Sequence, residues 1–380
     1  MIYLDNAATS FPKPGDCLRR ALERYLAQGA SPGRGGYDWA VQAEAEVAAV
    51  RLRLARFFGA GDKAHVCFAA NATDALNTLL QGLLAPGDHV ISSRLEHNSV
   101  LRPLHHLRQQ GVIDLDLLPF DGKGYIDPAS LAPCVRPQTR LVVITHASNV
   151  LGTVQPIAEI GAICSRHGIP LILDAAQSGG CIKVRMLDWH VQGLAFTGHK
   201  SLLGPTGIGG LVLAPGLHPR PTRFGGTGID SADPLQPLAY PSRLEAGTIN
   251  LLGILGLAET LGFVESSYES HYLREMHLLA RLIDGLKTLP RLRLYGSESL
   301  VDRLPLLSCN VDTIAATDVG AILDGDFAIA VRSGLHCAPL VHKDLGTSFG
   351  AGGTVRFSLG PFSSETDIDA ALQAMTAIAG

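Results

Sequence analysis

One lysine and one aspartate each stand at the end of an apolar run that is typical of a buried strand. Lys200 closes the segment AFTGHK, residues 195–200, and Asp174 closes LILD, residues 171–174. A partly desolvated lysine favours its neutral amine, which attacks aldehydes to form imines. A buried aspartate can keep a pyridine nitrogen protonated, so that the ring withdraws electrons. Together the two residues predict pyridoxal 5'-phosphate held as an imine on Lys200. Taken singly, a solvated loop lysine and a helix-capping aspartate stay open as interpretations.

Two further polar segments follow strands and suit the same cofactor. The segment NATD, residues 71–74, opens an apolar-periodic helix, so its free backbone N–H groups and the Thr73 hydroxyl are suited to a phosphate. His97 lies in RLEHN, residues 94–98, where an imidazole can stack on a cofactor ring and move protons. Simple helix capping and a surface histidine are the alternative interpretations.

A cysteine follows a histidine at the end of a later apolar run. In VRSGLHC, residues 331–337, a glycine-containing loop carries Cys337 directly after His336. An exposed thiol beside an imidazole is a usable nucleophile. A metal site made of His336, Cys337 and His342 is disfavoured, because a fourth ligand is not evident nearby and the spacing fits no standard zinc pattern. We therefore predict that the protein uses no metal.

The elements that must position these residues alternate in type. Short apolar runs predict strands over 65–68, 89–92, 141–145, 170–173, 194–197 and 209–213. Helical spacing of apolar residues lies between them over 41–58, 73–84, 99–109 and 157–167. This alternation predicts an α/β domain with a largely parallel sheet, whose strand ends form the ligand-binding edge.

The pattern changes in the second half of the chain. The Pro- and Gly-rich stretch 215–241 has no clear periodicity and predicts a long loop near the active site. A long helical region then reaches residue 289, and short strands over 304–311, 328–331 and 354–358 precede a terminal helix. We predict an N-terminal segment 1–15 that packs with a small domain, a large cofactor-binding domain 16–250 and a small C-terminal α/β domain 251–380.

The composition excludes several classes of protein. A hydrophobic content of 46% over 380 residues is enough for a large core, and a net charge of −4 without Lys/Arg runs argues against nucleic-acid binding. No apolar stretch approaches the roughly 20 residues of a membrane span, and the acidic start does not fit a signal peptide, so we expect a cytoplasmic protein without a membrane partner. The seven cysteines are scattered without a CxxC pair, which predicts reduced thiols.

Eight short motifs in fixed order resemble class V aminotransferase-like pyridoxal phosphate enzymes, specifically the group II cysteine desulfurase and selenocysteine lyase family. The motifs are YLDNAATSFPKP from Tyr3, ATDALN from Ala72, EHNS from Glu96, SNVLGT from Ser148, DAAQ from Asp174, TGHK from Thr197, EAGTIN from Glu245 and RSGLHCAP from Arg332. The resemblance spans nearly the whole chain. It implies fold type I, with a mostly parallel seven-stranded sheet flanked by helices in the large domain and a smaller C-terminal α/β domain.

The resemblance also implies a role for each matching residue. Lys200 would be the Schiff-base lysine, Asp174 the partner of the pyridinium and Gln177 a contact to the ring hydroxyl. His97 would stack on the ring and transfer protons. The phosphate contacts would come from the backbone at Ala72 and from Thr73, Thr197, His199 and, across a homodimer from the second subunit, Thr248.

The implied reaction is the conversion of L-cysteine to L-alanine. Arg356 would hold the substrate carboxylate with the help of Asn149 and Arg332. Cys337 would attack the substrate sulfur and keep it as a persulfide, for which a sulfur-acceptor protein is a possible partner. Leu335, where members of the family often carry a histidine, departs from the pattern. L-Selenocysteine cleavage, another class V reaction and a non-enzymatic scaffold stay open as alternatives.

Overall fold

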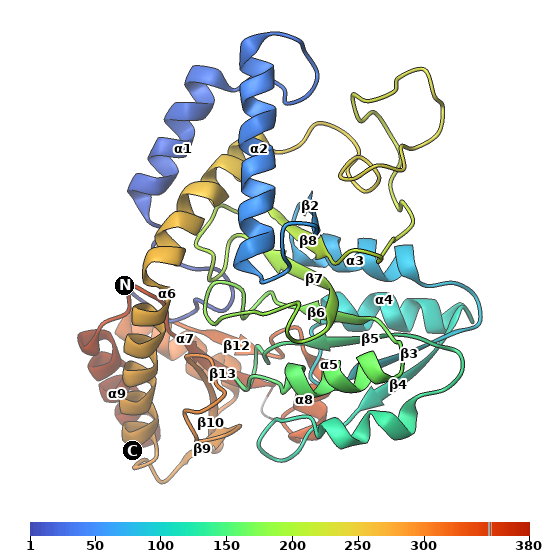
Figure 1. Cartoon of the computed structure of the whole chain (residues 1–380). Helices are drawn as coiled ribbons and strands as arrows, with labels where there is room; N and C mark the ends of the chain where they lie inside the picture. Colours follow the sequence, from blue (N-terminus) through green and yellow to red (C-terminus); the bar gives the residue numbers. More distant parts are fainter. Residues whose placement is uncertain (349, 351) are drawn as a thin grey trace.

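A seven-stranded sheet forms the centre of the molecule (Figure 1). The structure is a computed structural model that describes residues 1–348, 350 and 352–380. The strand order is β2-β8-β7-β6-β5-β3-β4. Six of these strands run in the same direction, and β8 runs in the opposite direction between β2 and β7. The strands are β2 (His65–Ala69), β3 (Asp88–Ser93), β4 (Ile113–Leu118), β5 (Thr139–Thr145), β6 (Leu171–Asp174), β7 (Val191–Thr197) and β8 (Gly209–Leu213). The predicted mostly parallel seven-stranded sheet is confirmed.

Helices cover both faces of this sheet, which explains why its strands are apolar throughout. In β5, Val142 and Ile144 join the core cluster that contains residues of α2 (Asp38–Phe57) and α5 (Ile157–Arg166). Leu141 and Val143 point to the opposite face and join the cluster that contains residues of α3 (Ala72–Leu83) and α4 (Asn98–Gln109). Successive side chains of a strand alternate between faces, so both sets must be apolar when both faces are covered.

A smaller antiparallel sheet lies beside the first, with the order β12-β13-β10-β9. Its core gathers apolar residues of the sheet and of the surrounding helices. The elements are β9 (Leu292–Tyr295), β10 (Leu306–Val311), β12 (Arg332–Gly334), β13 (Thr354–Ser358), α7 (Ala316–Phe327), α8 (Pro339–Asp344) and α9 (Glu365–Ala379). The prediction of a smaller α/β unit in the C-terminal part of the chain is confirmed.

The N-terminal segment and one long helix connect the two parts. β1 (Ile2–Tyr3) pairs in parallel with β11 (Ile329–Ala330), and Leu4 is buried in the core of the small sheet. The helix α6 (Leu251–Leu286) runs from beside α2 to the small sheet (Figure 1). It contributes residues to the cores of both sheets, so a domain boundary between residues 250 and 251 stays a prediction.

The predicted elements are all present, with ends that differ by a few residues. The sequence reasoning missed β4, an edge strand whose residues alternate between buried and more exposed positions, and α1 (Gly15–Gln28), which packs on α6. It also missed the short strands β1, β9 and β12 and the helices α7 and α8. The loop 215–241 contains no helix or strand, as expected. This loop does not line the cavity described below. Its Arg223 guanidinium pairs at 2.8 Å with Asp74, which lies in the first turn of α3 next to two residues that line the cavity. In the part of the chain that the structure describes, no helix is both long and apolar enough to cross a bilayer.

Candidate active site

A cavity of about 300 Å³ lies against the edge where the parallel strands end. The turns that follow β2, β3, β5, β6 and β7 all contribute to its lining. Ligands bind at this edge of open α/β sheets because the loops after parallel strands converge there. Eleven of the predicted site residues line the cavity: Ala72, Thr73, His97, Asn149, Asp174, Gln177, Thr197, His199, Lys200, Arg332 and Arg356.

Lys200 and Asp174 occupy the floor of this cavity from adjacent strand ends. Lys200 is half-buried, and partial desolvation lowers the pKa of its amine to about 8, against the opposing effect of the Asp174 charge. Burial raises the pKa of the Asp174 carboxyl, although Oδ1 accepts a hydrogen bond of 2.9 Å from the Ala176 backbone N–H. A buried carboxylate of this kind requires a positive partner. The pair therefore fits an amine nucleophile opposite a protonated pyridine nitrogen.

The first turn of α3 and the end of β7 provide donors for an anion. Asn71 caps α3 by accepting from the Asp74 backbone N–H at 3.0 Å, while the preceding N–H groups of Ala72 and Thr73 have no acceptor within the helix. Among the described residues, the buried Thr197 hydroxyl and His199 Nδ1 lack a hydrogen-bond partner. Unpaired buried polar atoms that face one cavity fit a phosphate group.

His97 projects into the cavity as a neutral imidazole. The Ser99 backbone N–H donates to its Nδ1 at 3.0 Å, so the neutral ring carries its proton on Nε2. Burial lowers the pKa of His97 to about 3, and the charges of Lys200 and Arg332 add to this effect. The ring is therefore uncharged at neutral pH.

Glu96, beside His97 in the same motif, was not predicted as a site residue. Its carboxyl is fully buried and accepts from the Ser93 hydroxyl at 2.6 Å and from the Thr145 backbone N–H at 3.0 Å. Burial raises its pKa to about 8, and Asp174 is a neighbouring acid that adds to the rise. Glu96 thus links the ends of β3 and β5 and fixes the turn that carries His97.

Two arginines enter the cavity from the small sheet. Arg356 on β13 is buried, and its Nη2 pairs with Asp5 Oδ1 at 2.7 Å while Nη1 donates to the Asn149 carbonyl at 3.0 Å. Its Nε has no partner within the described part of the chain. Arg332 lies opposite Arg356 in the β12–β13 pair. The cavity therefore offers guanidinium groups that suit a carboxylate ligand.

Cys337 lies outside this cavity, in an adjoining groove that His97, Ser99 and Thr73 also line. The Arg332 guanidinium donates to its Sγ over 3.4 Å. The loop is held by its backbone, since the Asn149 side chain donates to the His336 carbonyl at 2.6 Å and the Asn98 N–H donates to the Cys337 carbonyl at 2.7 Å. His336 and Cys337 have φ values of +47° and +58°, which bulky residues rarely adopt. These contacts place a partly exposed thiol at the mouth of the cavity.

Thr248 is a predicted site residue that lines neither the cavity nor the Cys337 groove. It lines a separate surface pocket together with Arg34, Arg51 and Glu245. Its place outside the cavity is compatible with the prediction that it acts on a second subunit. No group of three or more His, Cys, Asp or Glu side chains that could hold a metal comes together in the ranges 1–348 and 352–380.

The N-terminal segment supplies a part of the site that reasoning from single residues missed. Ala7 and Ala8 line the cavity, and Asp5 pairs with Arg356. The Gln177 side chain donates to the Ala7 carbonyl at 3.1 Å. Their motif, YLDNAAT, was noted as a family marker, but its contacts depend on residues more than 150 positions away.

Comparisons with known proteins agree with this geometry. The model of the aminotransferase class-V family matches residues 2–371. A protein of Methanothermobacter thermautotrophicus named probable cysteine desulfurase is 33% identical over 100% of this chain and 95% of its own length. A cysteine desulfurase of Dickeya dadantii is 33% identical over 97% of this chain and 90% of its own length.

Solved structures give the same result for the fold. The apo structure of a cysteine desulfurase from Thermococcus onnurineus has a TM-score of 0.91 and 32% identity, and the match covers 100% of this chain and 94% of that one. A cysteine desulfurase of Escherichia coli has a TM-score of 0.85 and 26% identity over 99% and 94% of the two chains. The chain belongs to the aminotransferase class-V family of pyridoxal phosphate-dependent enzymes, as its motifs predicted, and to the group within it that contains the cysteine desulfurases.

Proposed function

We propose that this protein is a cysteine desulfurase, which converts L-cysteine to L-alanine and takes up the sulfur on Cys337. The observation that carries the proposal is the position of the Cys337 thiol at the mouth of the Lys200 cavity, beside His97 and within 3.4 Å of the Arg332 guanidinium. A transaminase needs no thiol at this place. The desulfurase names of the full-length relatives support the same assignment.

The residues of the cavity fit pyridoxal 5'-phosphate. Asp174 would hold the ring nitrogen, Gln177 the ring hydroxyl and His97 one face of the ring. The phosphate would be held by the donors at the start of α3, at Ala72 and Thr73, and by Thr197 and His199. When bound, the cofactor withdraws electrons from the substrate Cα.

The protein's own groups perform the remaining work. Arg356, with Arg332 and Asn149, holds the substrate carboxylate and so directs its side chain toward the groove. The Lys200 amine takes the Cα proton, which its lowered pKa permits near neutral pH. Cys337 then attacks the substrate sulfur, so that an S–S bond forms on the enzyme while the substrate's C–S bond breaks. His97 is the proton carrier for the thiols.

A comparison of cysteine variants tests this proposal. Cys337→Ala should lower sulfide and alanine production from L-cysteine by about 10³-fold, because the nucleophile is absent, while the cofactor absorbance persists. Cys134→Ala is the matched control, since Cys134 is the other cysteine that is not fully buried, and it should keep full activity. Mass spectrometry of the unmodified protein after L-cysteine should detect one added sulfur on Cys337.

The same experiment separates the alternatives. Full sulfide release from Cys337→Ala would contradict the persulfide mechanism. If that variant still cleaves L-selenocysteine but not L-cysteine, the protein is a selenocysteine lyase for which the thiol is dispensable. A colourless protein that takes up no added pyridoxal phosphate would overturn the cofactor assignment itself.

We further propose that the active protein is a homodimer. Thr248 lies outside the cavity, and apolar side chains are exposed at the start of α2 and on the loop 215–241, of which Ile229 lines the same pocket as Thr248. They are Tyr37, Trp39, Val41, Phe224, Ile229, Leu235 and Leu238. Exposed apolar groups in such number are typical of a subunit interface. Light scattering should give twice the chain mass of 40.2 kDa.

We also propose a cytoplasmic location and a separate sulfur acceptor. All seven cysteines are free, which suits a reducing compartment. The groove that holds Cys337 is open to solvent along α4, so a persulfide there would be accessible to an acceptor thiol.

A further inference from the structure

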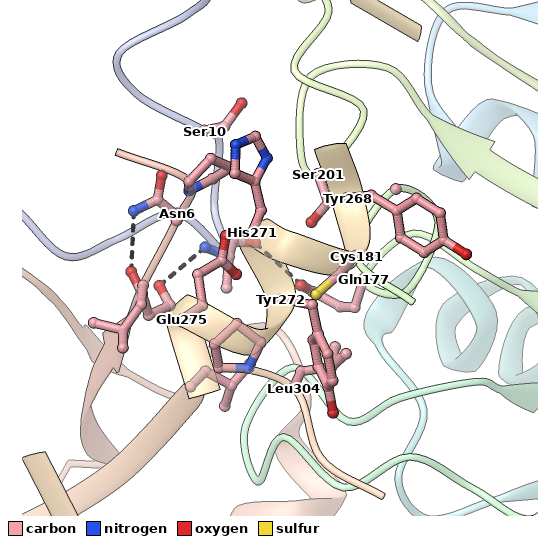
Figure 2. A pocket seen from close by; sticks show the side chains of 18 of the residues that line it. Asn6, Ser10, Gln177, Cys181, Ser201, Tyr268, His271, Tyr272, Glu275 and Leu304 are labelled. Carbon is pink, nitrogen blue, oxygen red and sulfur yellow. Dashed lines mark hydrogen bonds between the residues drawn. The ribbon is translucent and has the colours of Figure 1, made fainter. Parts of the chain in front are cut away.

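A second, smaller cavity of about 40 Å³ adjoins the active-site cavity and is shown in Figure 2. We call it the rear pocket. It is enclosed by the N-terminal segment, the turn after β6, the helix α6 and the chain at the end of β13. Ala7 and Gln177 line both cavities and so form part of the wall between them. A cavity of this size holds only a few water-sized groups.

One face of α6 supplies the polar side chains of the rear pocket. Tyr268, His271, Tyr272 and Glu275 are spaced so that they lie on the same side of the helix. Figure 2 shows these four side chains together with Asn6 and Ser10 of the N-terminal segment around the pocket. The helix thereby contributes one carboxyl group to the lining of the pocket, together with an imidazole and two phenols (Figure 2).

Glu275 is the acid of the rear pocket, and its carboxyl group has no partner among the described residues. Tyr272 donates to the Arg303 carbonyl at 2.9 Å, and Gln177 donates to the Ala7 carbonyl at 3.1 Å. Glu275 is 5% exposed and makes no hydrogen bond or ion pair with any residue that the structure describes. The adjacent Arg274 donates instead to the carbonyls of Pro361 and Ser363 at 2.6 and 2.7 Å.

An unpaired buried carboxylate has a large unfavourable free energy of desolvation, which a bound cation offsets. A single carboxyl and no second acid among the lining residues favour a monovalent cation over a divalent one. We propose that the rear pocket is a binding site for a small primary ammonium ion, held by the Glu275 carboxylate.

Such a ligand would join α6 to the N-terminal segment. Ser10 of that segment lines the rear pocket, and its hydroxyl donates to the Lys200 carbonyl at 3.0 Å. An ion held between Glu275 and this segment therefore stabilises the backbone on which Lys200 and Ala7 are placed. The site is separate from the proposed substrate site, since Glu275 does not line the active-site cavity.

Thermal unfolding with methylammonium chloride tests the site. The cofactor-loaded protein is first reduced with borohydride, so that the amine cannot react with the cofactor, and a sample without added cofactor is measured in parallel. At pH 8.5 a concentration ten times Kd should raise the unfolding midpoint by about 2 °C. Tetramethylammonium chloride at equal ionic strength should give no shift, because it is larger and has no N–H donor.

Matched variants assign the effect to the pocket. Glu275→Gln should abolish the shift, whereas Glu269→Gln, an exposed acid on the same helix, should retain it. An equal shift for Glu275→Gln or for tetramethylammonium would overturn the proposal. A shift in the sample without added cofactor supports the site even if the protein proves not to be a desulfurase, so the two proposals fail separately.

Calorimetry of the unmodified chain covers the case in which Glu275→Gln does not fold. Burial raises the pKa of Glu275 to about 8, so methylammonium should bind about tenfold more weakly at pH 7 than at pH 9. The titratable groups that face Glu275 stay neutral between pH 7 and pH 9. Burial lowers the pKa of His271 and raises the pKa values of Tyr268, Tyr272 and Cys181. Lys13, which donates to Ser10 Oγ, has a pKa lowered to about 8 but does not line the pocket. Affinity that does not change between pH 7 and pH 9 would contradict the assignment.

Discussion

The two halves of the active-site cavity are built in different ways. The half that suits the cofactor comes from turns directly after parallel strands, with Asp174 as the last residue of β6 and Lys200 three residues after β7. The half that suits the substrate comes from the small sheet and a loop, with Arg356 on β13 and Cys337 in a left-handed backbone conformation. The first half is positioned mainly by the sheet, with the N-terminal segment hydrogen-bonded to Gln177 and to the Lys200 carbonyl, whereas the second half is positioned by contacts between the two sheets.

This difference indicates which part of the site is positioned by strand pairing and which part is positioned by single hydrogen bonds and an ion pair. The ends of β6 and β7 are paired with a neighbouring strand on each side. The Cys337 loop is held by the Asn149 and Asn98 bonds, and Arg356 is held by Asp5 and the Asn149 carbonyl. Changes on the cofactor side should therefore abolish the chemistry, while changes on the substrate side should weaken binding or sulfur transfer.

The largest effect is expected for Lys200→Ala. Loss of the amine that takes the Cα proton should lower L-cysteine turnover by about 10⁴-fold, and bleaching of the yellow colour by borohydride should disappear. Lys183→Ala, at an exposed lysine of the same sheet region, should change turnover less than twofold. If Lys200→Ala turns over L-cysteine near the rate of the unmodified protein, the assignment of the chemistry to the cofactor half of the cavity is wrong.

A smaller effect is expected for Arg356→Lys on the substrate side. Lysine keeps the charge but cannot bind a carboxylate in bidentate fashion, so kcat/KM for L-cysteine should fall about 100-fold, mainly through KM. The cofactor absorbance should stay unchanged, because Arg356 lies in the other half of the site. Arg293→Lys on the exposed β9 is the control. Loss of cofactor from Arg356→Lys would show that the two halves are not separable.

The smallest effect is expected for the pH dependence of cofactor uptake. Burial lowers the pKa of Lys200 to about 8, and the neutral amine is the reactive form. The rate at which the apo protein takes up pyridoxal phosphate should therefore rise about tenfold from pH 7 to pH 9, with its midpoint near pH 8. Asp174→Asn should move this midpoint to lower pH, because the Asp174 charge raises the Lys200 pKa. A rate that is flat from pH 7 to pH 9 would contradict the role of burial.

The residues predicted to hold the cofactor line one cavity, and the sequence signals that pointed to them are local. Buried strands are marked by apolar runs, which here end at Asp174, at Thr197 and just before Thr73. The residues that follow such strands lie at the edge of the sheet where ligands bind. The motifs supplied the family, which the comparisons confirm. The edge strand β4 was missed because a short alternating run surrounded by helical pattern carries a weaker signal.

Only the tertiary structure decided which distant residues meet. The Arg356 and Asp5 pair joins residues 351 positions apart, and the buried Glu96 links two strand ends whose adjacency depends on the strand order. The unpaired Glu275 is likewise a consequence of how α6 packs against the N-terminal segment. The types and periodicity of residues determine strands, helices and the chemistry available at a strand end, because these depend on near neighbours. Partners and burial of a charged group depend on the whole packed chain, which no local pattern encodes.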